Sequence, residues 1–187
     1  MPAKRWTRIE YDRLIDKGVL GPENRIELLG GALVVREPQG SRHAMGIRMA
    51  EEALRRVFAG GWDVRVQLPV ALDEDSEPEP DVSVVPGSFR DYRHGHPPRA
   101  VLIVEVAESS LALDRIDKGS LYARAGLLDY WVANLADHAL EVYRAPAMAA
   151  GAPYGWSYAS LTTLRAGDVV TPLAAPHTSI PVVDLIP

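Results

Sequence analysis

The chain has 187 residues, a formal net charge of −5 and no cysteine. The lack of cysteine excludes disulfides, thiolate zinc sites and cysteine nucleophiles, and the acidic balance argues against a strongly basic nucleic-acid-binding surface. No apolar run approaches the roughly 18 residues that a membrane helix needs, and the first residues contain no apolar signal segment. We therefore expect one globular domain over residues 1–187, cytoplasmic and not associated with a membrane.

The first part of the chain predicts a short helix followed by a hairpin. Thr7 and Glu10 form a capping-box pattern, and Gly18 stands where this helix should end. In residues 25–35, two apolar runs flank Gly30-Gly31, a dipeptide that accepts the positive φ of a tight turn.

A longer helix should follow, capped by Ser41, because apolar residues then recur at helical spacing on one face. These residues are Ile47, Ala50, Leu54 and Val57. From Trp62 the period changes, and residues 62–72 resemble a strand that is weakened at Pro69. An acidic, proline-containing loop over residues 73–80 separates this strand from the next one.

The second half of the chain alternates strands with one further helix. Residues 100–107 are almost continuously apolar, which is typical of a strand that is buried on both faces. A helix should run from near Asp114 to Gly126. The other expected strands are residues 81–85, 130–134 and 139–145, the last two as an antiparallel pair. This order of elements predicts an α/β (α+β) fold, with a mixed sheet and helices packed on it.

Two carboxylates interrupt these apolar strands. Glu105 lies inside VLIVEVA, where an unpaired charge is costly, and Asp81 begins DVSVV. Two carboxylates on neighbouring strands can converge at one edge of a sheet and offer hard oxygen ligands to Mg²⁺ or Mn²⁺. The alternatives are a structural Glu105 that pairs with an arginine and an Asp81 that is only a turn residue after proline.

The helix after Glu105 adds a cation. Asp114, Lys118 and Tyr122 are spaced by four residues and therefore share one face. If this helix packs against the strand of Glu105, Lys118 can orient a water molecule or offset charge on a phosphate. The alternative is a solvent-exposed Asp–Lys pair that contributes little to stability.

The segments PEPDVSVV, IVEVA, SSLALDRIDKGSLYARAGLLDYWVAN and LEVYR occur in this order. Together they resemble the family of putative restriction endonucleases in the PD-(D/E)XK nuclease superfamily, over about residues 7 to 145. The resemblance implies a restriction-endonuclease-like mixed β-sheet flanked by helices, and Mg²⁺-dependent hydrolysis of DNA, with Mn²⁺ as a possible substitute. A homodimer is expected by analogy with nucleases that cut two strands.

The resemblance also implies the site residues. Asp81 and Glu105 would be catalytic and would bind the metal together with the backbone carbonyl of Val106. The plain motif has a lysine two residues after the glutamate, where this chain has Ala107. Lys118 from the following helix matches the place from which this family supplies the lysine.

Four further residues are candidates with weaker support. Glu27 is either an additional catalytic acid near the metal or an exposed hairpin residue. His43 either contacts phosphate or is structural. Gln67 could hydrogen-bond to the substrate near the site, and Tyr122 shares the face of Lys118 and could also contact the substrate.

Two other functions remain open at this stage. The acidic charge and the displaced lysine are compatible with a non-catalytic nuclease-fold module for binding or assembly. Alternatively, His94 and His96 could join Glu105 in a cupin-like, β-rich metal enzyme, although the long helices argue against a double-stranded β-barrel.

Overall fold

The computed structural model describes residues 4–36 and 38–187 of the chain. Within these residues, six strands form one mixed sheet in the order β3-β4-β5-β6-β7-β8. Neighbouring strands run antiparallel, except for β5 and β6, which are parallel. The strands are β3 (Trp62–Val66), β4 (Val82–Pro86), β5 (Leu102–Ala107), β6 (Asp129–Asn134), β7 (Ala139–Met148) and β8 (Trp156–Leu164).

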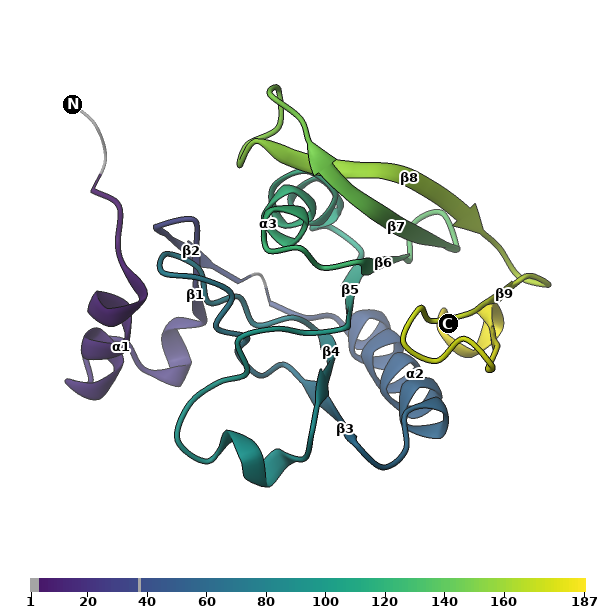
Figure 1. Cartoon of the computed structure of the whole chain (residues 1–187), viewed down its shortest axis with the longest axis horizontal. Helices are drawn as coiled ribbons and strands as arrows, with labels where there is room; N and C mark the ends of the chain where they lie inside the picture. Colours follow the sequence, from purple (N-terminus) through teal and green to yellow (C-terminus); the bar gives the residue numbers. More distant parts are fainter. Residues whose placement is uncertain (1–3, 37) are drawn as a thin grey trace.

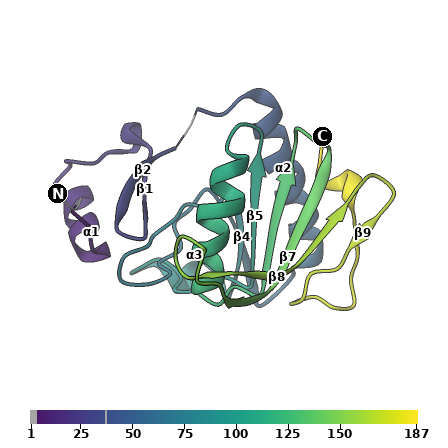
Figure 2. The same cartoon turned by 90° about the horizontal axis from the view of Figure 1, so that it is seen from above.

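Helices cover both faces of this sheet. Helix α2 (Ser41–Val57) lies on one face and α3 (Gly119–Arg124) lies on the other (Figure 1 and Figure 2). Helix α3 continues directly from a π-helical segment, η3 (Leu113–Lys118). The predicted fold class, a restriction-endonuclease-like mixed sheet flanked by helices, is confirmed.

Strand β5 shows why its sequence is almost entirely apolar. All six of its residues are buried. The even-numbered residues pack in the core beneath α2, whereas Ile103 and Ala107 pack with Tyr122 of α3 on the opposite face. Glu105 is odd-numbered, so it projects toward the α3 side of the sheet.

The N-terminal segment forms a separate group of elements beside the sheet (Figure 2). It contains α1 (Arg8–Asp16), the short 3₁₀ helix η1 (Pro22–Asn24) and the hairpin of β1 (Ile26–Leu29) and β2 (Ala32–Val35). The capping box predicted for Thr7 and Glu10 is confirmed. The remaining elements are η2 (Phe89–Tyr92), β9 (Val169–Val170), β10 (Ile180–Pro181) and η4 (Val182–Asp184).

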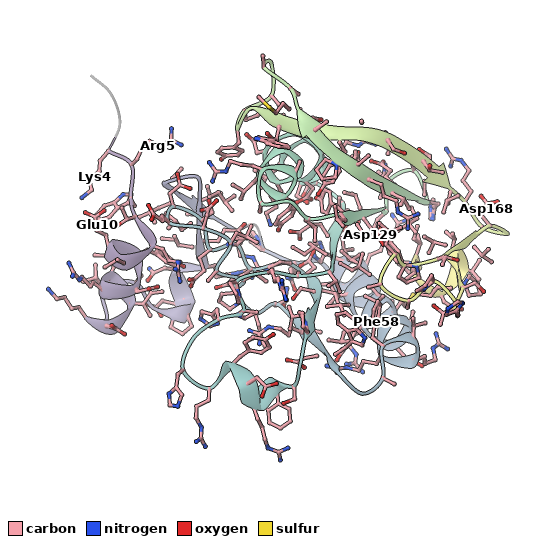
Figure 3. All side chains as sticks on the ribbon, in the orientation of Figure 1. Lys4, Arg5, Glu10, Phe58, Asp129 and Asp168 are labelled. Carbon is pink, nitrogen blue, oxygen red and sulfur yellow. The ribbon has the colours of Figure 1, made fainter. Side chains whose placement is uncertain are left out.

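Side chains fill the space between these layers (Figure 3). Phe58 and Asp129 lie inside the molecule, whereas Lys4 and Glu10 lie at its periphery. The buried Asp129 carboxylate is paired, because its Oδ1 atom accepts a hydrogen bond of 2.8 Å from Nε of Arg144. No helix in the part of the chain described here is long and apolar enough to span a membrane.

Three local predictions were wrong. The N-cap of α2 is Gly40 rather than Ser41, which is the first helical residue. Strand β3 ends at Val66, six residues before the predicted end at residue 72, because Gln67 has a left-handed backbone with φ of 50°. The third helical segment begins at Leu111 instead of near Asp114 and passes through the π-helical turn.

Candidate active site

The strand register brings Asp81 and Glu105 together. Val82 of β4 pairs with Val104 of β5 in antiparallel register, so the next position places Asp81 opposite Glu105 on the same face. The Asp81 N–H donates to Oε2 of Glu105 at 3.2 Å, and the Val106 N–H donates to Oδ2 of Asp81 at 2.9 Å. Both side chains are almost fully buried. The apolar strand that follows Asp81 therefore serves to hold this carboxylate against its neighbour.

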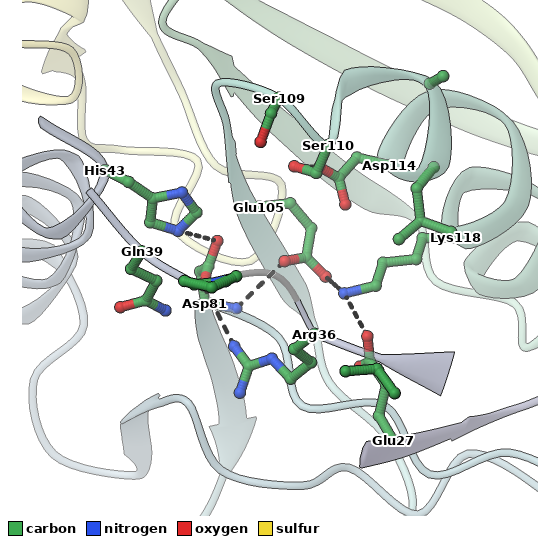
Figure 4. A pocket seen from close by; sticks show the side chains of 14 residues that line it. Glu27, Arg36, Gln39, His43, Asp81, Glu105, Ser109, Ser110, Asp114 and Lys118 are labelled. Carbon is green, nitrogen blue, oxygen red and sulfur yellow. Dashed lines mark hydrogen bonds and ion pairs between the residues drawn. The ribbon is translucent and has the colours of Figure 1, made fainter. Parts of the chain in front are cut away.

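Lys118 supplies the positive charge on this face. Its Nζ lies 3.1 Å from Oε1 of Glu105 and 3.1 Å from Oε1 of Glu27 (Figure 4). Lys118 is only 5% exposed. The hydroxyl of Tyr122 donates to the same Glu105 oxygen at 2.7 Å. The predicted common face of Lys118 and Tyr122 is thus turned toward Glu105, and the alternative of a solvent-exposed lysine is wrong.

The helix that carries Lys118 is locally widened. The N–H of Gly119 donates to the carbonyl of Asp114, an i to i−5 bond that defines a π-helical turn. Asp114 is buried, and its Oδ2 accepts a hydrogen bond of 2.6 Å from the hydroxyl of Ser110. Such turns occur frequently at functional sites. Here the turn ends at Lys118 itself.

Three nitrogen-bearing side chains lie close to the Asp81 carboxylate. Nε2 of His43, from the first turn of α2, lies 3.2 Å from Oδ2. Arg36 approaches from the end of β2, with Nη2 at 3.5 Å from Oδ1, and Gln67 brings its amide nitrogen to 3.4 Å from the same oxygen. Figure 4 shows the contacts of His43 and Arg36 with Asp81.

Glu27 belongs to the site and not to an exposed hairpin surface. It lies on β1 and is 1% exposed. One carboxylate oxygen contacts Lys118, and the other accepts a hydrogen bond of 2.9 Å from the N–H of Glu79. The β1–β2 hairpin therefore contributes a third carboxylate to the neighbourhood of Lys118.

Asp81, Glu105, Lys118 and Glu27 lie at the wall of a cavity of about 320 Å³, which we call the carboxylate cavity. This volume is at the lower end of the range for small-ligand sites. Its charged and ionisable lining residues are Glu27, Arg36, His43, Asp81, Glu105, Asp114 and Lys118.

Burial and neighbouring charges set different proton affinities for the two facing carboxylates. Burial raises the pKa of Glu105 to about 8, although the charge of Lys118 acts in the opposite direction. Burial would also raise the pKa of Asp81, but the hydrogen bond and charge of His43 and the N–H of Val106 outweigh it and hold this pKa below its usual value. The environment therefore favours the ionised form of Asp81 more strongly than that of Glu105.

The donor set has the chemistry of a hard-cation site. Asp81 and Glu105 supply carboxylate oxygens at the wall of one cavity, and Mg²⁺ is commonly held by one or two carboxylates while it keeps several waters. Across residues 4–36 and 38–187, no group of three or more His, Cys, Asp or Glu side chains is arranged to hold a metal ion. The site therefore fits a cation held by few side chains and not a closed cage.

Two residues predicted to bind substrate occupy other positions. Tyr122 is fully buried beneath Glu105 and is not part of the cavity lining, so its position suits orienting Glu105. Gln67 also lies outside the carboxylate cavity but contacts Asp81. Their roles toward a substrate stay predictions, as do those of the other site residues.

Sequence reasoning missed Arg36. Its guanidinium contacts both Asp81 and Glu79, with Nη1 at 2.8 Å from Oε2 of Glu79. One signal was present in the sequence, because Arg36 is a charged residue that directly follows the apolar run ALVV. This run forms β2, which pairs with the strand of Glu27.

The histidine-based metal site is wrong. His96 lies beside Glu77, with Nε2 at 3.9 Å from Oε1, and neither His94 nor His96 lines the carboxylate cavity. The sheet is a six-stranded mixed sheet within the described residues and not a double-stranded β-barrel.

The six-stranded mixed sheet flanked by helices has a nuclease-like fold. The model of the Uma2 family, described as "Putative restriction endonuclease", matches residues 9–182. The chain belongs to this family. A search of curated proteins gave no match.

A solved structure from Anabaena variabilis ATCC 29413, described as "a putative nuclease belonging to DUF820", is similar to this chain with a TM-score of 0.71 and 14% sequence identity. The match covers 96% of this chain and 97% of the other. At this identity the likeness shows the fold.

Proposed function

We propose that this chain is a metal-dependent DNA endonuclease that hydrolyses phosphodiester bonds. One observation carries the proposal: Asp81 and Glu105 face each other across adjacent strands, beside Lys118, at the wall of an accessible cavity. Membership of a family described as "Putative restriction endonuclease" supports DNA as the substrate.

Mg²⁺, or Mn²⁺ in its place, would be held by Asp81, Glu105 and the backbone carbonyl of Val106. When bound, such an ion lowers the pKa of a coordinated water and polarises a phosphodiester. The N–H of Val106 and the side chain of His43 fix the orientation of Asp81. Tyr122 does the same for Glu105. These contacts preorganise both carboxylates before a substrate arrives.

Lys118 would act on the phosphate. Its ammonium lines the cavity and forms ion pairs with two carboxylates, so it suits offsetting negative charge that develops on the phosphoryl oxygens. In the reaction, the oxygen of water forms a bond to phosphorus and the bond from phosphorus to a deoxyribose oxygen breaks. The attacking water gives up one proton to solvent and the leaving oxygen takes one up from solvent, so protons balance and the enzyme forms no covalent bond to the DNA.

A second function, a non-catalytic nuclease-fold module for binding or assembly, is favoured by one feature of the same network. Glu105 accepts hydrogen bonds from Lys118, from the hydroxyl of Tyr122 and from the N–H of Asp81. A carboxylate that is satisfied by the protein in this way is also suited to a purely structural role.

The proposal is tested by measuring the nicking of supercoiled plasmid in Mg²⁺ or Mn²⁺ by wild type and by Lys118→Met. The control is Lys17→Met, a change at an exposed lysine. We expect the Lys118 variant to lose cleavage while it keeps its Mn²⁺ affinity, because a protonated lysine is not a metal ligand. Calorimetric titration with Mn²⁺ and circular dichroism establish binding and folding of the same samples. Cleavage at the wild-type rate would remove Lys118 from the mechanism.

We also propose that the enzyme acts in the cytoplasm. A homodimer is proposed as well, since one active site cuts one strand at a time. Sedimentation of the protein with and without a DNA duplex measures its oligomeric state. A strict monomer on DNA that still cuts both strands together would contradict the dimer.

A further inference from the structure

A second cavity, which we call the flanking cavity, adjoins the carboxylate cavity. It has a volume of about 730 Å³ and lies between the end of α1, η1 and the side chains of residues 36, 38 and 39. Arg36, Pro38 and Gln39 line both cavities. A molecule that occupies the carboxylate cavity can therefore extend into the flanking cavity past these residues.

The lining of the flanking cavity combines apolar surface with several polar and charged side chains. Tyr11, Ile15 and Ile26 contribute apolar or aromatic surface, and the polar or charged lining residues are Arg25, Arg36, Gln39, Gln67 and Glu79. Within the described residues, the guanidinium of Arg25 and the amide of Gln39 have no hydrogen bond or ion pair to another side chain. Apolar walls with a few free polar groups are typical of sites for small planar molecules such as a nucleobase.

The flanking cavity is physically linked to Asp81. Gln67 and Arg36 both line it, and these are the two residues that contact Oδ1 of Asp81, at 3.4 and 3.5 Å. The backbone of Gln67 is left-handed, which is uncommon for a residue other than glycine, and its N–H donates to the carbonyls of Pro80 and Asp81. The local backbone is thus shaped to place one side chain between the cavity and the catalytic carboxylate.

We propose that the flanking cavity binds the base and phosphate of an unpaired nucleotide beside the scissile bond, so that the substrate is DNA with a single-stranded segment. This inference rests on the proposed function. Asp81 is 4% exposed and Glu105 is 2% exposed, so the phosphodiester must enter a cavity to reach them. A base in a duplex must first be unstacked and unpaired to enter such a site, whereas a single strand does not have this cost.

The charges agree with this substrate. Arg25 and Arg36 lie in the flanking cavity, where they can contact phosphate, although Arg36 is also paired with Glu79. The chain as a whole carries a formal net charge of −5. It therefore lacks the strong basic excess that usually supports binding along an uninterrupted duplex.

The test uses Ile15→Ser and Arg25→Gln. Their controls are Ile9→Ser and Arg13→Gln, which change the same residue types on α1 outside the cavity. Ile15 is 45% exposed and Ile9 is 64% exposed, so both changes should leave the fold intact. Fluorescence anisotropy in EDTA measures the affinity for a labelled single strand and for the duplex of the same sequence. Cleavage of both DNAs is then measured in Mn²⁺.

We expect tighter binding and faster cleavage of the single strand, and about tenfold weaker single-strand binding by each cavity variant than by its control. Equal affinity and cleavage rate for the duplex and the single strand would overturn the inference, and so would cavity variants that behave like their controls. In either case, metal-dependent cleavage would still support the proposed nuclease function. The expected binding pattern without cleavage would support the cavity and refute the proposed function. Neither binding nor cleavage would refute both.

Discussion

Replacement of Lys118 by methionine tests the described network most sharply through stability. Methionine keeps most of the buried volume but removes the ammonium that lies 3.1 Å from Glu27 and 3.1 Å from Glu105. Glu27 is 1% exposed, so water cannot replace its lost partner, whereas Glu105, whose pKa burial raises to about 8, can take up a proton at neutral pH. Breaking a buried ion pair in this way costs about 3–5 kcal/mol, whereas an exposed pair contributes about 0–1 kcal/mol.

For a chain of this length, that loss corresponds to a decrease in melting temperature of roughly 6–20 °C. Urea unfolding at neutral pH measures the change, and Lys17→Met, an exposed lysine at the end of α1, should shift stability by less than about 0.5 kcal/mol. Adding Glu27→Gln to the Lys118 variant should recover part of the loss, because one unpaired charge is removed. A change below about 1 kcal/mol for Lys118→Met would refute the buried network.

Two further predictions concern the scaffold. Gly46→Ala should lower stability despite the better helix propensity of alanine, because an added Cβ would lie 2.8 Å from Cγ1 of Val106; thermal unfolding measures this. Burial and the charge of Asp12 raise the pKa of Glu77 from 4.5 to about 7. Between pH 4.5 and about 7, Glu77 therefore keeps its proton in the folded state and loses it in the unfolded state. Its contribution to the free energy of unfolding is fully present below pH 4.5 and is lost as pH rises through about 7. Glu77→Gln should gain about 3 kcal/mol relative to wild type between pH 4.5 and 8 in urea unfolding.

Each of these predictions has a clear control. A Cβ added at Gly60 would meet nothing within 4 Å, so Gly60→Ala should not reproduce the loss at Gly46. A neutral or stabilising Gly46→Ala would mean that α2 and β5 are not in such close contact. A constant difference between Glu77→Gln and wild type across pH would contradict the raised pKa of Glu77.

The sequence was most informative where a charge interrupted an apolar strand. Glu105 stood out because every neighbour in β5 is apolar, and the spacing of Lys118 and Tyr122 already placed both on one helix face. The paired position of Asp81 followed from the strand that begins after it. These patterns are local. When the strands and the helix are buried, the pattern decides on which face of each element these side chains lie.

The parts that sequence did not predict depend on tertiary contacts. The position of Arg36 after an apolar run is only a weak local signal, because its contact with Asp81 arises when the β1–β2 hairpin packs beside that residue. The π-helical turn before Lys118 and the left-handed Gln67 reflect packing and hydrogen bonds to distant segments. The sequence of the hairpin is compatible with an exposed or a buried Glu27 side chain. The tertiary contact with Lys118 shows that it is buried.

The most direct test of the central claim is the Mn²⁺-dependent cleavage of labelled DNA by wild type and by Asp81→Asn. Asparagine keeps the size of the side chain and removes the charge that would hold the cation, and Asp16→Asn on exposed helix α1 is the control. We expect cleavage by wild type and Asp16→Asn, abolished by EDTA, and none by a folded Asp81→Asn protein. Equal, metal-dependent cleavage by Asp81→Asn would contradict the claim.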